Sequence, residues 1–517
     1  MPSHKGNETA KNIDLPEVKS IGNEYQSWFI CNVFTKPVLR TLPIDRSHYL
    51  LASAGVLLIA ATTVITLISS HFALDTLPTE QPVILLVSLM IFTGIIYLAI
   101  SRFFNNLIPS KRALIFIIGV GLALRIITIA STPILEGDYF RYLWDGAVLS
   151  KGLSPYEYSP EHVLDGNNAR AIPPALKNLA KESGEIIHRI NHPQLKTIYP
   201  PIAQSAFVIA HWLQPWSILS WRMVLLFFDI ITLVLILRIL RTLHLPNLAV
   251  LVYWWNPLLV KELFNSGHLD VIAFPFVLGS LLLNLRKNYL WSVVLLALSI
   301  GVKLWPIVLI PLVLRPLTED PKRLSLGIGI FVLILATLMI PYYTTGIDES
   351  SALLAFGQSW QNNDSIFKIL VWCSQLILEI LGKHPGHGHL IARILDSTLI
   401  AGSIFYISSR YVKRPKELFE KSLVIIAAVF LLIPTQFPWY YTWMLPFLAV
   451  APRPSLLLLT ALLPLYYLRY YLEPRGMISY FDYLIVWIEF VPVWILLILE
   501  WRSERKAALT EQMRILT

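Results

Sequence analysis

The sequence predicts an all-α protein that crosses a membrane many times. Of its 517 residues, 55% are hydrophobic and only 15% are charged, and the mean hydropathy is +0.60. Soluble domains carry about a quarter charged residues, so this deficit indicates an exterior that faces lipid. Successive apolar runs such as Leu50–Ile68, Val83–Ser101 and Ala113–Ser131 reach the ~20 residues that span a hydrocarbon core. Because lipid offers no hydrogen bonds, each run must satisfy its own backbone as a helix.

Hydropathy along the chain predicts about 12 to 14 such crossings. The expected spans are 49–69, 83–101, 112–131, 222–240, 247–263, 270–285, 289–314, 324–342, 390–408, 421–437, 440–452, 455–471 and 483–501. We expect 289–314 to be two short halves broken at Pro306, because one straight helix would put the basic loop that follows it on the wrong side. We expect 201–219 and 366–382 to be interfacial or re-entrant helices.

The charges of the loops predict the orientation. Loop 70–82 has acids but no Lys or Arg and is predicted outside, whereas loop 102–112 carries three basic residues and is predicted inside. The same rule predicts a cytoplasmic N-terminal tail (1–48), a transmembrane domain (49–501) and a cytoplasmic C-terminal tail (502–517). Inward-facing basic loops therefore explain the net charge of +9, which gives no support for a nucleic-acid partner.

A large polar loop, 134–200, follows the third predicted helix and is therefore expected outside the cytoplasm. It opens with Glu136 and Asp138. A carboxylate at the start of the one large outer loop suggests chemistry at the membrane surface, and a solvated interfacial carboxylate is the alternative. Two more polar segments, 343–365 and 434–441, are expected on the same face.

Ionisable residues at membrane depth are costly and are therefore candidate functional residues. Glu262, His268 and Asp270 lie at an outward turn between two predicted spans. The His–Asp pair could contribute to a metal site, but two ligands are too few for one, and a hydrogen-bonded structural pair is the alternative.

Three cations also lie within apolar segments: Arg125, Arg222 and Lys303. A buried cation needs an anionic partner. For Lys303 that partner could be a carboxylate or the phosphate of a ligand, and Asp229 could pair with one of the two arginines. Trp439 and Tyr440 follow a proline-rich turn and could stack on a sugar or line a lipid site, or they could belong to the aromatic belt at the interface.

Common motifs of soluble enzymes are absent from the sequence. It contains no Gly-rich phosphate loop, no Gly-x-Ser-x-Gly elbow, no Cys/His metal spacing and no dinucleotide fingerprint. A donor handled as a soluble nucleotide in the cytoplasm is therefore not supported.

The segment 136–146 (Glu-Gly-Asp-Tyr-Phe-Arg-Tyr-Leu-Trp-Asp-Gly) and the later Gly-Leu-Ser-Pro-Tyr at 152–156 resemble the first luminal loop of GT-C superfamily glycosyltransferases. The nearest type is the polyprenol-phosphate-mannose-dependent mannosyltransferases. Four further segments follow in the order that this group shows: 198–201, 256–270, 303–306 and 434–441. Related enzymes often carry Asp-x-Asp in the loop, whereas this chain has Glu136 at the first position, which leaves open whether a divalent cation takes part and whether one or two carboxylates act.

The resemblance implies inverting transfer of a hexosyl group, mannosyl above all, from a polyprenyl-phosphate sugar to a glycolipid or envelope-glycan acceptor. It implies Asp138 as general base, because the acceptor hydroxyl must lose a proton. Cations would stabilise the departing phosphate, with Lys303, His268 and Arg222 as its contacts. Glu262 and Asp270 would orient groups or bind sugar hydroxyls. The remaining expected substrate-binding residues, in the outer loops and beside them, are Glu136, Arg141, Tyr199, Trp439 and Tyr440, together with the segment from Gln358 to Asp364.

Three other interpretations stay open at this point. A transporter or flippase for polyprenyl-linked or other anionic substrates would also need charges at membrane depth, although no internal repeat is visible. A related enzyme could use a different donor, such as polyprenyl-phosphate glucose or aminoarabinose. A non-catalytic scaffold would have little use for these charges. The compact loops favour a bacterial inner membrane with the active site on the periplasmic face.

Overall fold

The computed structural model describes residues 44–73, 75–103, 109–165, 172–345 and 360–516. Within these ranges there is no β-strand, only an isolated parallel bridge between Asn362 and Thr435. Residues Pro43–Val493 form one compact unit, and Trp494–Thr517 belong with residues 1–42 to a second. The expected N-terminal tail lies almost wholly outside the described residues.

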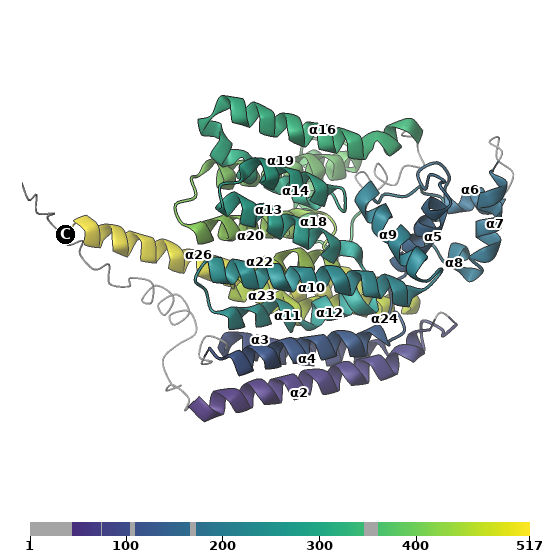
Figure 1. Ribbon diagram of the computed structural model, residues 1–517, viewed down its shortest axis with the longest axis horizontal. Coiled ribbons are helices and arrows are strands. Elements are labelled where there is room, and N and C mark those ends of the chain that lie inside the picture. Colours follow the sequence, from purple (N-terminus) through teal and green to yellow (C-terminus); the bar gives the residue numbers. More distant parts are fainter. Residues whose placement is uncertain (1–43, 74, 104–108, 166–171, 346–359, 517) are drawn as a thin grey trace, which may run out of the picture. The chain divides into compact units, whose positions relative to one another are not determined.

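The long helices of the compact unit run alongside one another (Figure 1). Helix α2 packs against α3 and α4, and α14 packs against α16. The long helices of this unit are α2 (Ile44–Ile68), α3 (Val83–Phe103), α4 (Lys111–Ile129), α10 (Ile218–Thr242), α16 (Pro321–Thr345), α18 (Ile366–Ile380), α19 (Gly388–Ser409) and α20 (Pro415–Leu432). Helix α26 (Val486–Leu516) begins in this unit, and its residues from Trp494 onward belong to the second.

Shorter helical pieces occupy the centre and one end of the unit. Those in the outer loop are α5 (Asp138–Ser150), α6 (Pro160–Asp165), α7 (Pro174–Glu182) and α8 (Glu185–His188), and α9 (Pro201–Leu213) follows the loop directly. Those between the long helices are η3 (Asn247–Val250), α11 (Leu251–Trp254), α12 (Pro257–Val260), η4 (Lys261–Asn265), η5 (Leu269–Ile272), α13 (Ala273–Leu285), α14 (Tyr289–Ile300), η6 (Trp305–Leu309), α15 (Ile310–Leu314), α21 (Pro438–Tyr441), η9 (Thr442–Met444), α22 (Leu445–Leu448), α23 (Pro454–Leu462), η10 (Leu463–Tyr467) and α24 (Leu468–Leu472).

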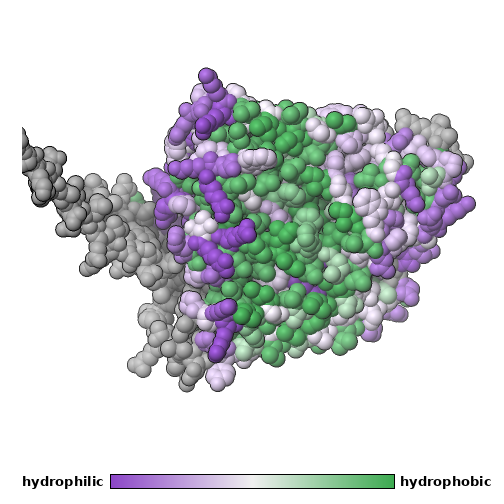
Figure 2. Space-filling model, in the orientation of Figure 1, coloured by the Kyte–Doolittle hydropathy of each residue, from purple (hydrophilic) through white to green (hydrophobic). Residues whose placement is uncertain are grey.

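The predicted all-α polytopic membrane fold is confirmed. Eight helices of the described chain are long and apolar enough to cross a membrane, and a bent helix pair with a 99° kink, Pro257–Asn265 with Leu269–Leu285, could add a ninth. Figure 2 shows hydrophobic side chains across the middle of the compact unit and hydrophilic ones toward its two ends, one of them over α5–α8. This apolar band has the surface that lipid requires.

Three of the other expected spans, 247–263, 289–314 and 440–452, are built from short helices. Segment 247–263 is divided among η3, α11 and α12, and 440–452 among α21, η9 and α22. Segment 289–314 is interrupted between α14 and η6, directly before Pro306, as the charge rule predicted. Prolines near the starts of α12, η6, α21 and α22 remove backbone donors and begin new turns, which hydropathy alone does not detect.

The outer loop is anchored to the bundle by the packing of α5 on α9. Gly146 makes this contact possible, because a Cβ at that position would lie 2.5 Å from the backbone carbonyl oxygen of Phe207. Backbone cannot move aside as a flexible side chain does, so α5 would have to shift.

We expect Gly146→Ala to lower the free energy of unfolding by about 1–3 kcal/mol, the cost typical of overpacking. Thermal unfolding of the purified protein in detergent measures this. Gly402→Ala is the matched control, because Gly402 lies inside α19 and a Cβ added there would have no neighbouring atom within 4 Å. An unchanged melting temperature for Gly146→Ala would contradict the packing argument.

Candidate active site

The break between α12 and α13 forms the centre of the candidate site. Asn256 caps α12 by accepting a hydrogen bond from Leu259 N at 2.9 Å, and Pro257 begins the helix. The next turn, Lys261–Asn265, is π-helical, a feature frequent at functional sites. Gly267 then has φ of +80°, a conformation that costs a residue with a Cβ far more than it costs glycine. The chain turns sharply here and leaves polar side chains at the break.

Asp138 lies in the first turn of α5, where the helix dipole favours a negative charge. Its Oδ1 accepts a hydrogen bond from Asn191 Nδ2 at 3.5 Å, and its side chain is 30% exposed. Burial raises the pKa of the Asp138 carboxyl above its ordinary value, and the Asn191 hydrogen bond and the charge of Lys303 partly oppose this rise. A partly open carboxyl with a raised pKa suits a general base.

His268 lies between two carboxyl groups. Its Nδ1 is 3.8 Å from Asp138 Oδ2, and its Nε2 is 3.4 Å from Glu262 Oε2. The imidazole is 1% exposed and stacks on the Trp439 ring, with 4.1 Å between ring centroids. The structure thus brings together four of the residues predicted from sequence, from three separate segments of the chain.

Glu262 has two further partners, Tyr467 and Lys261. The Tyr467 hydroxyl donates to Glu262 Oε1 in a short hydrogen bond. The Lys261 Nζ donates to the Tyr467 hydroxyl at 2.7 Å and lies 3.4 Å from Glu262 Oε1. Sequence analysis missed both residues. The signal for Lys261 was present, because it is a cation beside Glu262 in an apolar segment.

Lys303 pairs with Asp270 at the other side of the site. Its Nζ is 2.6 Å from Asp270 Oδ1, which also accepts a hydrogen bond from Trp443 Nε1 at 2.5 Å. The ammonium lies 4.7 Å from the centroid of the Tyr440 ring, and the Lys303 side chain keeps 19% of its surface exposed. Asp270 is fully buried, so Lys303 is the member of the pair that another molecule can reach.

An aromatic wall, which we define as Phe437, Trp439, Tyr440, Trp443 and Trp305, borders these polar groups. Phe437 stacks on Trp439 at 4.3 Å, Tyr440 on Trp443 at 4.5 Å, and Trp443 on Trp305 at 5.2 Å. Stacked indole and phenol rings beside carboxylates offer both the flat apolar faces and the hydrogen-bonding groups to which a sugar binds. The expected position of Trp439 and Tyr440 beside the other site residues is therefore observed.

Glu136 lies near this cluster and contacts a C-terminal segment. Its Oε1 accepts a hydrogen bond from the Tyr470 hydroxyl at 3.2 Å. Burial raises the pKa of the Glu136 carboxyl well above its ordinary value, and the charge of Lys261 partly opposes this.

Arg141 and Tyr199 hold the outer loop together. Arg141 Nη2 donates to the carbonyls of His192 and Leu195 at 3.2 and 3.1 Å. The Tyr199 carbonyl accepts from the Tyr156 hydroxyl at 2.8 Å. These contacts stabilise the segment that carries Asn191, the hydrogen-bond partner of Asp138.

Arg222, which we expected to contact donor phosphate, instead binds backbone. Its two Nη atoms donate to the carbonyls of Ile129, Ser131 and Asn265 at 2.8, 2.7 and 2.6 Å. These carbonyls lie at the end of α4 and in the π-helical turn, where the helix offers them no hydrogen-bond donor, so they bind the guanidinium instead. Both Nη atoms are therefore engaged by backbone, and a phosphate contact of Arg222 stays a prediction.

Arg125 has the alternative partner that the sequence suggested. Its Nε lies 2.5 Å from Asp229 Oδ2, and both side chains are fully buried. Asp229 also accepts a hydrogen bond from the Tyr253 hydroxyl at 2.5 Å. The pair is structural and lies between α4 and α10.

We expect Arg125→Met to lower the free energy of unfolding by about 3–5 kcal/mol, because it leaves the Asp229 charge buried without a partner. The double variant with Asp229→Asn removes both charges and should regain most of that loss. Thermal unfolding in detergent compares the three proteins. Equal destabilisation by the single and double variants would contradict the ion-pair explanation.

The described residues contain no cluster of three or more His, Cys, Asp or Glu side chains that could hold a metal ion. The geometry around His268 gives the reason. Asp138 and Glu262 approach opposite ring nitrogens, so one ion could not contact both carboxylates and the imidazole together.

The second outer segment reaches the first through aromatic contact. Trp360 packs on the ring of His192 at 5.0 Å between centroids, and Asp364 is buried and accepts from Gln361 Nε2 at 3.1 Å. Gln358, expected in the acceptor cleft, lies outside the described residues.

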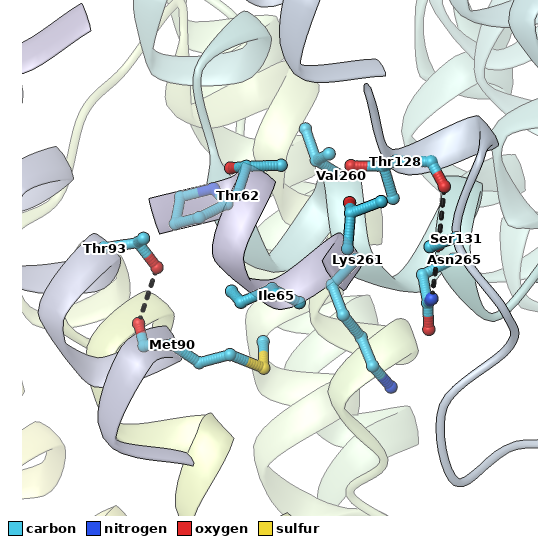
Figure 3. Close-up of a pocket in the computed structure, with 11 residues that line it drawn as sticks. Thr62, Ile65, Met90, Thr93, Thr128, Ser131, Val260, Lys261 and Asn265 are labelled. Carbon is cyan, nitrogen blue, oxygen red and sulfur yellow. Dashed lines mark hydrogen bonds between the residues drawn. The ribbon is translucent and has the colours of Figure 1, made fainter. Parts of the chain in front are cut away.

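A small cavity borders the π-helical turn, and Asp138 is not among its lining residues. Its volume is about 20 Å³, enough for one water molecule. Figure 3 shows Lys261 and Asn265 in its wall, together with residues of α2, α3 and α4. The lining residues are Thr62, Ile65, Thr66, Met90, Thr93, Thr128, Ser131, Pro257, Val260, Lys261 and Asn265.

Comparison with known proteins assigns the family. A search of curated proteins and a search of solved structures gave no match. The MptA_B family model, described as alpha-(1->6)-mannopyranosyltransferase, N-terminal domain, matches residues 48–318. The match spans just over half of the chain and includes Asp138, Glu262, His268 and Lys303. This chain, a multi-pass membrane protein, belongs to that mannosyltransferase family.

Proposed function

We propose that this mannosyltransferase takes its sugar from a polyprenyl-phosphate mannose and transfers it to a hydroxyl of a lipid-linked or envelope glycan. The observation that carries the proposal is that the site beside the aromatic wall contains both an accessible carboxylate, Asp138, and an accessible ammonium, Lys303. The first can accept a proton and the second can stabilise a phosphate. The lack of any soluble-nucleotide motif in the sequence favours a lipid-linked donor.

The reaction needs one base. An acceptor hydroxyl loses its proton to Asp138 Oδ2 while its oxygen forms a bond to C1 of mannose. The bond between C1 and the phosphate oxygen breaks in the same step, and its electron pair leaves with the polyprenyl phosphate. Such a single displacement inverts C1, so an α-linked product requires a β-linked donor. The description of the family as alpha-(1->6)-mannopyranosyltransferases is the basis for proposing an α-1,6 bond.

Lys303 supports the departure of the phosphate. Negative charge grows on the bridging oxygen as the bond to C1 breaks, and an ammonium held in a fixed position stabilises that charge. Asp270 and Trp443 hold the ammonium in position through the contacts described above. The Trp439 face, next to His268, is the proposed stacking surface for a sugar ring.

We also propose the extracytoplasmic face of a bacterial inner membrane as the place of reaction. The charge rule predicts loops 102–112 and 315–323 to be cytoplasmic, and Asp138 follows the other end of α4, the helix that begins at Lys111. A lipid-linked donor is accessible there without a nucleotide pool.

The test is transfer of radiolabelled mannose by the purified protein in detergent, with a membrane lipid extract as acceptor. β-Polyprenyl-phosphate mannose, its α anomer and GDP-mannose are compared as donors. We expect product from the β anomer only, and release of the label by an α-mannosidase. Product from GDP-mannose alone would overturn the proposed donor. Tight binding of polyprenyl-phosphate mannose without transfer to any acceptor would favour the transporter.

A further inference from the structure

Two buried side chains, Arg222 and Asn265, join the segment before the proposed base to the turn that follows α12. Arg222 donates from Nη1 to the carbonyls of Ile129 and Ser131 at 2.8 and 2.7 Å, and from Nη2 to the carbonyl of Asn265 at 2.6 Å. One guanidinium therefore connects the end of α4 to the end of the π-helical turn.

The Asn265 side chain joins the same two segments a second time. Its Nδ2 donates to Ser131 Oγ and to the Thr132 carbonyl, each at 2.7 Å, and its Oδ1 accepts from Ile134 N at 2.9 Å. All of these contacts are within hydrogen-bond length. We call the side chains of Arg222 and Asn265 the backbone clamp.

The contacts of Arg222 in the described chain are carbonyls, whereas Arg125, another buried arginine, has Asp229 as its ionic partner. A buried cation without a carboxylate is costly. A neutral amide has only two N–H donors, whereas the planar guanidinium reaches three carbonyls in fixed directions. Arginine at this position therefore suits a place where the spacing between two segments matters.

The residue before Arg222 supports the same arrangement. Trp221 Nε1 donates to the Gly267 carbonyl at 2.7 Å, and its ring packs on the ring of Tyr142 at 5.4 Å between centroids. Adjacent residues of α10 thus contact both α5, the helix that begins at Asp138, and the turn after α12.

We propose that the backbone clamp positions Asp138 relative to the Lys303 ammonium during transfer. Asp138 comes soon after Ile134 in the chain, and Asp270, which pairs with Lys303 at 2.6 Å, comes soon after Asn265. Single displacement needs the base and the departing phosphate on opposite sides of C1, and a misplacement of about 1 Å can cost ~10² in rate. The two clamp residues act through these groups and are positioning residues.

The test measures transfer from β-polyprenyl-phosphate mannose by the full-length protein in detergent. For Arg222→Met and Asn265→Ala we expect kcat to fall by ~10 to 10², with the donor KM close to the wild-type value. Arg125→Met is the matched control, because it removes a buried arginine whose partners, Asp229 and two carbonyls, lie outside the clamped segments. Below its melting temperature it should keep the wild-type kcat.

A double variant tests whether the clamp acts through the base. In the Asp138→Asn background Asn265→Ala should cost little further activity, because the effects of residues that act as a unit are not additive. A further loss by the same factor as in the wild type would overturn the proposal and leave Asn265 a residue of general stability. A raised donor KM for Arg222→Met alone would overturn it in favour of a phosphate contact.

Hydrogen exchange gives a readout that does not depend on transfer. We expect the backbone amides of residues 138–146 to exchange faster in Arg222→Met and Asn265→Ala than in the wild type, and at the wild-type rate in Arg125→Met. Unchanged exchange in both clamp variants would overturn the proposal. The role of the clamp rests on the proposed function: a wild type inactive with every donor would defeat that function, whereas an active wild type with clamp variants of unchanged kcat would defeat the clamp alone.

Discussion

Asp138→Asn is expected to lower the rate of mannosyl transfer by ~10² or more, the scale expected when a general base is lost. Asparagine has nearly the same shape as aspartate, and its side-chain oxygen can still accept from Asn191, so α5 should begin as before. Its amide cannot take a proton from the acceptor hydroxyl. Initial rates of radiolabelled mannose transfer by the purified variant and wild type measure the loss, with donor binding recorded in parallel and expected to be retained.

The pH dependence of transfer tests the same carboxyl. Since burial raises the pKa of Asp138 above the usual 3.8, and the base acts only as a carboxylate, the wild-type rate should fall as the pH decreases through that raised pKa. Asp138→Asn should lose this acidic limb. Asp165→Asn, an exposed acid of α6 in the same loop, is the control and should behave as wild type. If Asp138→Asn kept more than a tenth of wild-type activity, Asp138 would be eliminated as the base.

Hydropathy and charge were sufficient to predict the fold class. Long runs such as 83–101 became single helices because every backbone group in lipid must be paired within its own segment. The short central segments were harder. In 440–452 the sequence is as apolar as a span, yet it is divided into three short helical pieces, since its surroundings are protein and prolines interrupt its hydrogen bonds. Hydropathy does not distinguish lipid from a protein interior.

Individual residues of the candidate site could be predicted from the sequence, but the contacts among them could not. Asp138, His268 and Trp439 were each identifiable as polar or aromatic groups at outward turns. Their meeting depends on how segments up to 300 residues apart pack, which no local pattern records. Tyr467 gave no signal at all, because a tyrosine in an apolar run is ordinary for a membrane helix. The backbone contacts of Arg222 were unpredictable for a related reason, since the carbonyls that it binds come from the ends of other helical segments.

Lys303→Met is expected to reduce kcat/KM for the donor by ~10² or more, the cost typical of removing one group that stabilises charge in a transition state. Methionine keeps the length of the side chain and removes its charge. The same change leaves Asp270 buried without its ionic partner, at 2.6 Å in the wild type. We therefore also expect the free energy of unfolding to fall by about 3 kcal/mol. Steady-state kinetics and thermal unfolding in detergent are measured on the same preparation.

The double variant Lys303→Met with Asp270→Asn separates these two effects. Removing both charges abolishes the uncompensated carboxylate, and asparagine can still accept a hydrogen bond from Trp443. Stability should therefore return close to the wild-type value, while transfer should stay low because the phosphate still lacks its cation. If transfer also returned, Lys303 would serve only to neutralise Asp270, and the departing phosphate would have to be stabilised elsewhere in the site. If the double variant is stable and its transfer rate stays low, the Lys303 ammonium does more than neutralise Asp270.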